Sequence, residues 1–111
     1  MPIVNVESSA NADLHEKVMS TINMLTTSEY SGKNWTGHTS FKVNGELFDI
    51  TRWFSPGQDE DDITLPLYDW ECEHVQSRKR YGIIQEENES RDYAVYQIAI
   101  WIVNGLWKED N

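Results

Sequence analysis

The chain contains a single cysteine, Cys72, which excludes an internal disulfide bond. We also expect no signal peptide, because the first residues, MPIVNVESS, have neither its basic nor its apolar region. The most apolar stretch is shorter than a membrane span of about 20 residues. These absences favour a cytoplasmic protein without a membrane partner. The 111 residues suffice for a single domain, 1–111, with its own core.

Motifs of catalysis and cofactor binding are missing as well. No phosphate-binding loop, dinucleotide fingerprint, nucleophile elbow or zinc pattern occurs. Cys72 and His74 lie two residues apart, which is a poor spacing for a metal chelate, and no further Cys or His completes a set. We therefore expect no catalytic residues, no metal site and no cofactor, and we expect that the protein is not an enzyme.

Basic residues are scarce. Nine Lys and Arg stand against 19 Asp and Glu, which gives a formal net charge of -10. Residues 1–58 hold six acids and four bases, or -2, whereas residues 59–111 hold 13 acids and five bases, or -8. Such a field repels nucleic acid and membrane headgroups and attracts basic surfaces. The composition predicts a basic protein partner and no direct binding of nucleic acid, with a merely solubilising charge as the alternative.

Large apolar side chains are concentrated in residues 93–107. A helical period places them in two stripes, Tyr93, Tyr96, Ile100, Val103, Trp107 and Val95, Ile98, Ala99, Ile102, Leu106. Ser90 can cap the start of this helix and Asn104-Gly105 its end. A strand is the alternative, because many of these residues are β-branched or aromatic, but the run exceeds a typical strand. We predict a central helix, and its nearly all-round apolar surface also fits a homodimer through this C-terminal helix.

A β-hairpin is predicted over residues 39–50, because two alternating runs flank Asn44-Gly45, a two-residue turn signal. The pairing puts Phe41 opposite Phe48 and Thr39 opposite Ile50. One face then carries the apolar side chains Phe41, Val43, Phe48 and Ile50. The other face is expected to be partly exposed to solvent, and it carries Lys42, Asp49 and Thr51 beside Leu47 and Trp53.

The remaining elements follow from weaker patterns. Residues 12–25 carry Leu14, Val18, Ile22 and Leu25 on one helical face, and residues 2–6 alternate as a short edge strand. Residues 69–81 have the charges of a helix, with acids early and 78–80 basic, although their apolar pattern is poor; strand-turn-strand is the alternative. Pro66 confines residues 63–67 to an edge strand or an extended segment, and residues 81–85 return as a short strand.

These elements predict an α+β fold. A small antiparallel sheet with the Asn44-Gly45 hairpin is packed by an N-terminal helix and a long apolar C-terminal helix.

The acids between residues 59 and 73 form the candidate partner-binding surface, because no Lys or Arg interrupts them. Nearby aromatic side chains would anchor a complex that charge has steered together. The candidate residues are Asp59, Glu60, Asp61, Asp62, Asp69, Glu71 and Glu73 with Trp53, Tyr68 and Trp70.

Three functional hypotheses follow. The first is a small acidic inhibitor that mimics nucleic acid and occupies the groove of a nuclease or another nucleic-acid-binding protein, as anti-restriction and anti-CRISPR proteins of phages and mobile elements do. The second is an immunity or antitoxin-like protein that neutralises a basic toxin. The third, ranked below both, is a carboxylate-dependent enzyme that uses His74 or Tyr81.

Overall fold

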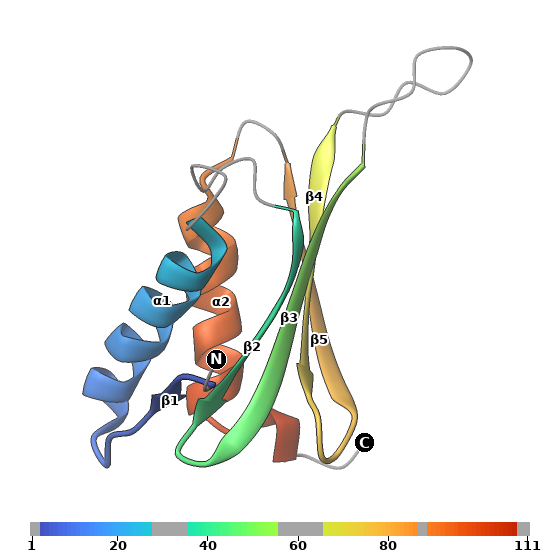
Figure 1. The fold of residues 1–111 in the computed structure, drawn as a ribbon. Coiled ribbons are helices and arrows are strands. Elements are labelled where there is room, and N and C mark those ends of the chain that lie inside the picture. The colour runs from blue at the N-terminus through green and yellow to red at the C-terminus, as the bar shows by residue number, and fades with distance from the viewer. Residues whose placement is uncertain (1–2, 28–35, 56–65, 87–88, 109–111) are drawn as a thin grey trace.

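The computed structural model describes residues 3–27, 36–55, 66–86 and 89–108 of the chain. Its elements are β1 (Asn5–Val6), α1 (Asn11–Thr27), β2 (Gly37–Val43), β3 (Glu46–Ser55), β4 (Leu67–His74), β5 (Lys79–Glu86), α2 (Arg91–Val103) and the 3₁₀ turn η1 (Leu106–Lys108). The strands form one sheet in the order β1-β2-β3-β4-β5, which is antiparallel except for the parallel pair β1 and β2. Both helices pack on the same face of this sheet (Figure 1). The predicted α+β class is confirmed.

The β2–β3 hairpin has the predicted register. Phe41 pairs with Phe48, and Thr39 pairs with Ile50. Asn44 and Gly45 form the turn, both with positive φ (47° and 86°), which a two-residue turn between twisted strands requires. The four apolar side chains of the inner face are buried, as the alternation predicted.

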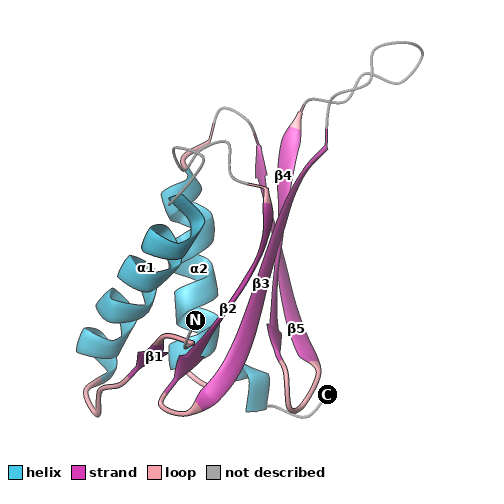
Figure 2. Cartoon of the chain, in the orientation of Figure 1, coloured by secondary structure: helices cyan, strands magenta, loops and turns pink. Residues whose placement is uncertain are grey.

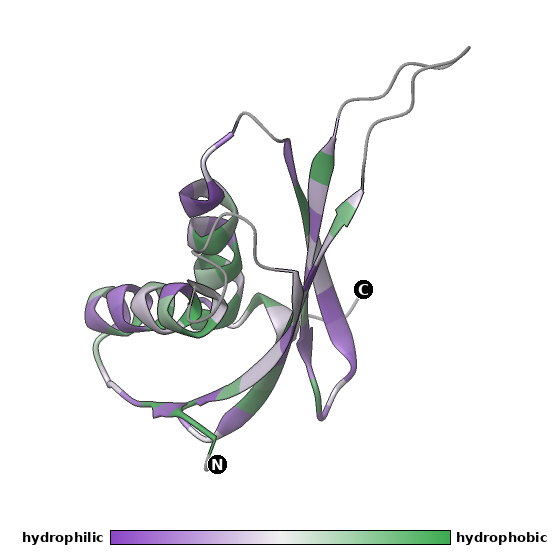
Figure 3. Cartoon of the chain, turned by 45° about the horizontal axis from the view of Figure 1, so that its top comes forward, coloured by the Kyte–Doolittle hydropathy of each residue, from purple (hydrophilic) through white to green (hydrophobic). Residues whose placement is uncertain are grey.

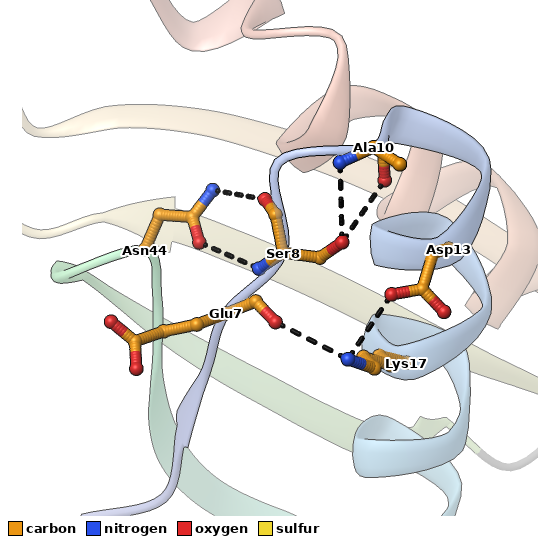
Figure 4. A network of polar contacts seen from close by, with 6 residues as sticks. All are labelled: Glu7, Ser8, Ala10, Asp13, Lys17 and Asn44. Atoms are coloured by element: carbon orange, nitrogen blue, oxygen red, sulfur yellow. Dashed lines mark hydrogen bonds and ion pairs between the residues drawn. The ribbon is translucent and has the colours of Figure 1, made fainter.

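The same turn ties the N-terminal segment to the sheet (Figure 4). Oδ1 of Asn44 accepts a hydrogen bond from the backbone N–H of Ser8 (3.0 Å), and Nδ2 of Asn44 donates one to the Ser8 carbonyl (3.1 Å). Lys17 of α1 donates to the carbonyl of Glu7 and forms an ion pair with Asp13 (3.1 Å). Asn44 and Lys17 therefore hold the start of α1 beside the hairpin, and the sequence pattern did not predict these contacts.

The helix predicted over residues 69–81 is wrong, and the strand-turn-strand alternative is the observed structure. Residues 67–74 form β4, residues 75–78 form the turn, with Arg78 at φ 63°, and residues 79–86 form β5. Trp70, Cys72 and His74 are buried while the residues between them are not, which is the period of a strand. The basic triplet that suggested a helix end lies instead at the turn.

Of residues 63–67, predicted as an edge strand or an extended segment, the structure describes Pro66 and Leu67, and Leu67 does not lie in an edge strand. Leu67 starts β4, which lies between β3 and β5 in the sheet. Pro66 precedes the first residue of the strand, so its missing N–H removes no hydrogen bond from the ladder. Residues 63–65 lie outside the described residues.

The helices bury one stripe each. In α1, Leu14, Val18 and Ile22 are buried. In α2 the buried side chains are Ala94, Val95, Ile98, Ala99, Trp101 and Ile102. Of the other predicted stripe, Tyr93 and Tyr96 are exposed and Ile100 is partly buried, whereas Val103 and Trp107 pack against the core.

The predicted ends of α2 are confirmed. Oγ of Ser90 accepts from the backbone N–H of Asp92, and Gly105 takes a positive φ of 66° just past the last helical turn. The C-terminal segment is therefore a helix and not the strand that was its alternative. The homodimer through this helix stays a prediction. Tyr93 and Tyr96 are the large side chains that α2 exposes for such a contact.

The core lies between the helices and the sheet and is formed by apolar residues of both layers (Figure 3). Among the described residues, no helix has the length and apolar character needed to cross a membrane.

Candidate functional site

The sheet has two unlike faces. Successive side chains of a strand point to opposite sides, so each strand contributes alternate residues to the helix-covered face and to the open face. Among the described residues, no helix packs against the open face (Figure 1). Its side chains come from alternate positions of β2 to β5: His38, Ser40, Lys42, Leu47, Asp49, Thr51, Trp53, Asp69, Glu71, Glu73, Arg80, Ile84 and Glu86.

Four carboxylates lie together on this open face. Asp69, Glu71 and Glu73 follow one another along β4, and Asp49 of β3 pairs directly with Glu73. Side chains two residues apart on a strand are about 6.7 Å apart, and neighbouring strands are about 4.8 Å apart. We call these four residues the acidic row. The sequence had placed three of them in the candidate site, and only the β3–β4 pairing adds Asp49.

The acidic row is neutralised at one end only. Asp49 accepts a hydrogen bond from Oγ of Ser40 (2.5 Å) and lies 3.6 Å from Nε2 of His38. Glu73 forms an ion pair with Nε of Arg80 (3.3 Å). Within the described part of the chain, Asp69 and Glu71 have no ion-pair partner. Gly82 pairs with Glu71, so β5 places no side chain beside that carboxylate.

Apolar side chains flank the free end of the row. Trp53 pairs with Asp69, which in turn pairs with Ile84. Trp53 is 38% exposed and Ile84 is 54% exposed. An indole beside two unpaired carboxylates combines a flat apolar contact with charge, which is the composition of many protein-binding surfaces.

The charge of the row also acts through the sheet. Burial raises the pKa of the Cys72 thiol well above its usual value, and the negative charges of Asp49, Glu73 and Glu71 raise it further. Cys72 is fully buried on the helix-covered face. Its thiol therefore stays protonated.

Two of the predicted aromatic anchors do not lie on the open face. Trp70 is fully buried under the helices, and its indole N–H donates to Oε1 of Gln85 (2.9 Å). Tyr68 has the same parity and stacks on Arg52, whose guanidinium carbon is 3.7 Å from the ring centroid. Burial, and then the charge of Arg91, lowers the pKa of Arg52 to about 10. The proposal of Trp70 as a surface anchor is wrong, because its position in β4 turns it toward the core.

Sequence reasoning missed two members of the surface and proposed others that cannot be placed. The sequence places Asp49 on the solvent-exposed side of the hairpin. A helix over residues 69–81 does not predict that Asp49 pairs with Glu73. Ile84 was missed for the same reason. The predicted residues Asp59, Glu60, Asp61 and Asp62 lie outside the described residues.

His74 is the centre of a second polar cluster, on the helix-covered side. Nδ1 of His74 lies 2.7 Å from Oγ of Ser77 and accepts from the Ser77 backbone N–H, and Nε2 lies 2.7 Å from Oε1 of Glu46. The ring stacks on Trp107, with centroids 3.8 Å apart. Because Nδ1 is an acceptor, the ring proton sits on Nε2 and is donated to Glu46. Nδ1 thus holds the β4–β5 turn in place, and Nε2 ties His74 to the start of β3.

A cavity of about 410 Å³ adjoins this cluster and is lined by Glu46, Phe48, Trp107 and Lys108 among others. Of the described residues, no three His, Cys, Asp or Glu side chains are grouped so that they could hold a metal ion. No protein-family model, curated protein or solved structure matches this chain.

Proposed function

We propose that this protein is a non-enzymatic binding protein that presents the acidic row, with Trp53 beside it, to a basic protein partner of the kind that binds nucleic acid. The observation that carries the proposal is the alignment of four carboxylates on an uncovered sheet face. Its carboxylates would stand in for phosphates, so the protein would act as an inhibitor that mimics nucleic acid, as phage anti-defence proteins do.

The charge spacing supports mimicry in magnitude. Asp69, Glu71 and Glu73 span about 13 Å, since a strand rises about 3.3 Å per residue. One strand of duplex DNA carries a charge per ~3.4 Å of axis, or about four charges over the same length. Along β4 the acidic row has one carboxylate per about 6.6 Å, roughly half the charge density of one DNA strand. Asp49 beside Glu73 brings the carboxylates over this length to four, and Arg80 neutralises the one on Glu73. The acidic row follows a strand, whereas the phosphates of DNA follow a helix. We therefore expect the row to imitate the close spacing of negative charges and not the shape of the grooves.

The arrangement of the row supports binding more than catalysis. The cross-strand neighbours of Asp69 are Trp53 and Ile84, and those of Glu71 are Thr51 and Gly82, so no histidine, cysteine or lysine pairs with either carboxylate. His74, the residue that an enzyme would use, faces the other side of the sheet and has both ring nitrogens occupied. The carboxylates and the histidine therefore do not form one constellation.

The test compares two variants with the same change of net charge. The face variant is Asp69→Asn, Glu71→Gln and Glu73→Gln. The matched control is Glu7→Gln, Glu16→Gln and Asp92→Asn, three exposed acids from other parts of the molecule. Each protein is immobilised and exposed to host lysate at low and high salt, and the captured proteins are identified by mass spectrometry.

We expect the wild type and the control to capture basic nucleic-acid-binding proteins that added duplex DNA displaces and that high salt releases. The face variant should lose them. Capture of the same proteins by the face variant, at the same salt dependence, would falsify the proposal. Capture of a basic toxin that DNA does not displace would instead favour the immunity-like alternative, which the same surface serves.

Trp53 tests the apolar part of the surface. With a purified partner, Trp53→Ala should weaken binding by tenfold or more, on the order of an interface hot spot, mainly through faster dissociation. The acid replacements should act mainly on the association rate.

A further inference from the structure

The outer edge of β5 carries an interaction surface that is separate from the acidic row. β5 is one edge of the sheet and runs for eight residues, whereas β1, the opposite edge, has two. The edge of β5 is uncovered by any described element (Figure 2). A strand of this length with a free edge can add another strand to the sheet.

The direction of the backbone groups on this edge follows from Glu86. Its N–H donates to Oε1 of Glu89 and its carbonyl accepts from the Glu89 N–H, so both groups of Glu86 point away from β4. Backbone groups alternate sides along an antiparallel strand. The N–H and C=O groups of Arg80, Gly82 and Ile84 therefore also point outward, whereas those of Glu86 are already satisfied within the chain.

Basic and acidic side chains lie at opposite ends of this edge. The end near the turn is basic, with Arg78, Lys79 and Arg80, and the far end is acidic, with Glu86 and Glu89. Gly82 lies midway, and Ile84 is 54% exposed beside it. A second β5 laid antiparallel would place its acidic end against the first basic end.

We propose that two copies of this chain pair edge to edge through β5, antiparallel, with Gly82 facing Gly82 of the second copy on a twofold axis perpendicular to the sheet. Arg80 then pairs with Ile84 of the second copy, and these three outward residues of each strand supply about six N–H···O bonds. Glu86 of each copy comes opposite Arg78 and diagonal to Arg80 of the other, within reach of long side chains.

The chain itself selects this register. A shift by two residues, with Gly82 opposite Ile84, would require the Glu86 N–H that Glu89 already holds. A shift by one residue would pair an outward-facing backbone with an inward-facing one and put the open face of one copy beside the covered face of the other. The absence of a side chain at Gly82 also leaves the axis clear for the close approach of two strands.

A second copy fits this edge better than an unrelated strand, because the charge polarity of β5 is complementary to itself about Gly82. The paired molecule would have a continuous ten-stranded sheet, twice the five strands of one chain. Both acidic rows would lie on the same side of it. The inference does not depend on the proposed function, since the pairing uses backbone groups of Arg80, Gly82 and Ile84 and no carboxylate of the acidic row.

The test is the molecular mass in solution, measured by analytical ultracentrifugation over a concentration series. Ile84→Pro removes an outward N–H that takes no part in the β4–β5 ladder, so the fold should survive while the dimer is lost. Ile84→Val is the matched control, because it keeps the N–H and a β-branched side chain. Circular dichroism and thermal unfolding establish that each variant is folded.

A charge exchange provides a second, independent arm. Glu86→Arg should raise the dimer dissociation constant about tenfold or more, because it faces arginines of the second copy. Adding Arg78→Glu to the same chain should restore part of the affinity. The face variant Asp69→Asn, Glu71→Gln, Glu73→Gln should dimerise like the wild type, which separates this inference from the proposed function.

Three results would overturn the inference. One is a wild type that stays monomeric at the highest concentration reached. Another is a dimer that persists in both Ile84→Pro and Glu86→Arg. The third is a dimer broken equally by Ile84→Val. A dimer that instead dissociates on Tyr96→Glu would place the contact on α2.

Discussion

The two faces of the sheet are built from the same strands, and yet they place the same residue types in different environments. Trp70 and Trp53 lie on neighbouring strands, but the first is fully buried with its indole N–H bonded to Gln85, while the second is 38% exposed beside Asp69. His74 is held on both ring nitrogens under the helices, whereas His38 lies on the open face next to Asp49. The comparison teaches that residue type did not decide a role here. Strand parity did, because one residue of shift exchanges core for surface.

The largest expected difference is between the two tryptophans. Trp70→Ala should lower the free energy of unfolding by about 3 to 5 kcal/mol, because it leaves a cavity in the core and removes the hydrogen-bond donor to Oε1 of the buried Gln85. Trp53→Ala should cost under about 1 kcal/mol, since the side chain keeps much of its surface in water. Urea unfolding followed by circular dichroism measures both. Equal costs would mean that the open face is covered in solution.

A similar contrast separates the two stripes of α2. Ile98 is fully buried, so Ile98→Ala should cost about 2 to 5 kcal/mol. Ile100, which the sequence suggested as a core position, is only partly buried, and Ile100→Ala should cost less than half as much. The pair is measured by the same unfolding experiment. A larger loss at Ile100 than at Ile98 would contradict the observed rotation of the helix and favour a contact on its outer stripe.

The pH dependence of stability tests the raised pKa of the buried Cys72 thiol. Since burial and nearby carboxylates raise the pKa of the Cys72 thiol in the folded state, the unfolded chain releases this proton first, near its ordinary pKa of 9.0. The unfolded state then binds fewer protons, so stability falls as pH rises above about 8.5, by at most ~1.4 kcal/mol per pH unit. Cys72→Ala should flatten this slope between pH 8 and 10, within the range set by those pKa values. An unchanged slope would show that the thiol ionises equally in both states.

The smallest expected effect is the stability change on neutralising the free end of the row. Asp69→Asn with Glu71→Gln should change the free energy of unfolding by no more than about 0.5 kcal/mol, with a gain as the expected sign, because the two charges repel each other and have no described ion-pair partner. Thermal unfolding at low and high salt measures it. A loss above 1 kcal/mol would mean that these acids hold the fold together, in contrast to the role proposed for them.

Three confirmed predictions concern features with purely local causes. The turn at Asn44-Gly45, the cap at Ser90 and the left-handed Gly105 each depend on neighbours within a few residues, and all three are observed. The helix predicted for residues 69–81 failed because acids before bases suit a helix and a hairpin turn alike. Its apolar alternation, Trp70, Cys72 and His74, was present in the sequence but short, and only pairing with β3 and β5 made it decisive.

The sequence by itself determined that this chain is strongly acidic, that its acids are concentrated in the second half, and that a hairpin and two helices surround one apolar core. These properties are totals over the chain or patterns among residues close in sequence, so they can be determined without the tertiary structure. Only the tertiary structure decided which acids lie together, that Asp49 joins those of β4, that Trp70 leaves the surface, and that β5 forms an open edge. Those properties depend on strand pairing between residues far apart in the chain, which local preferences do not encode.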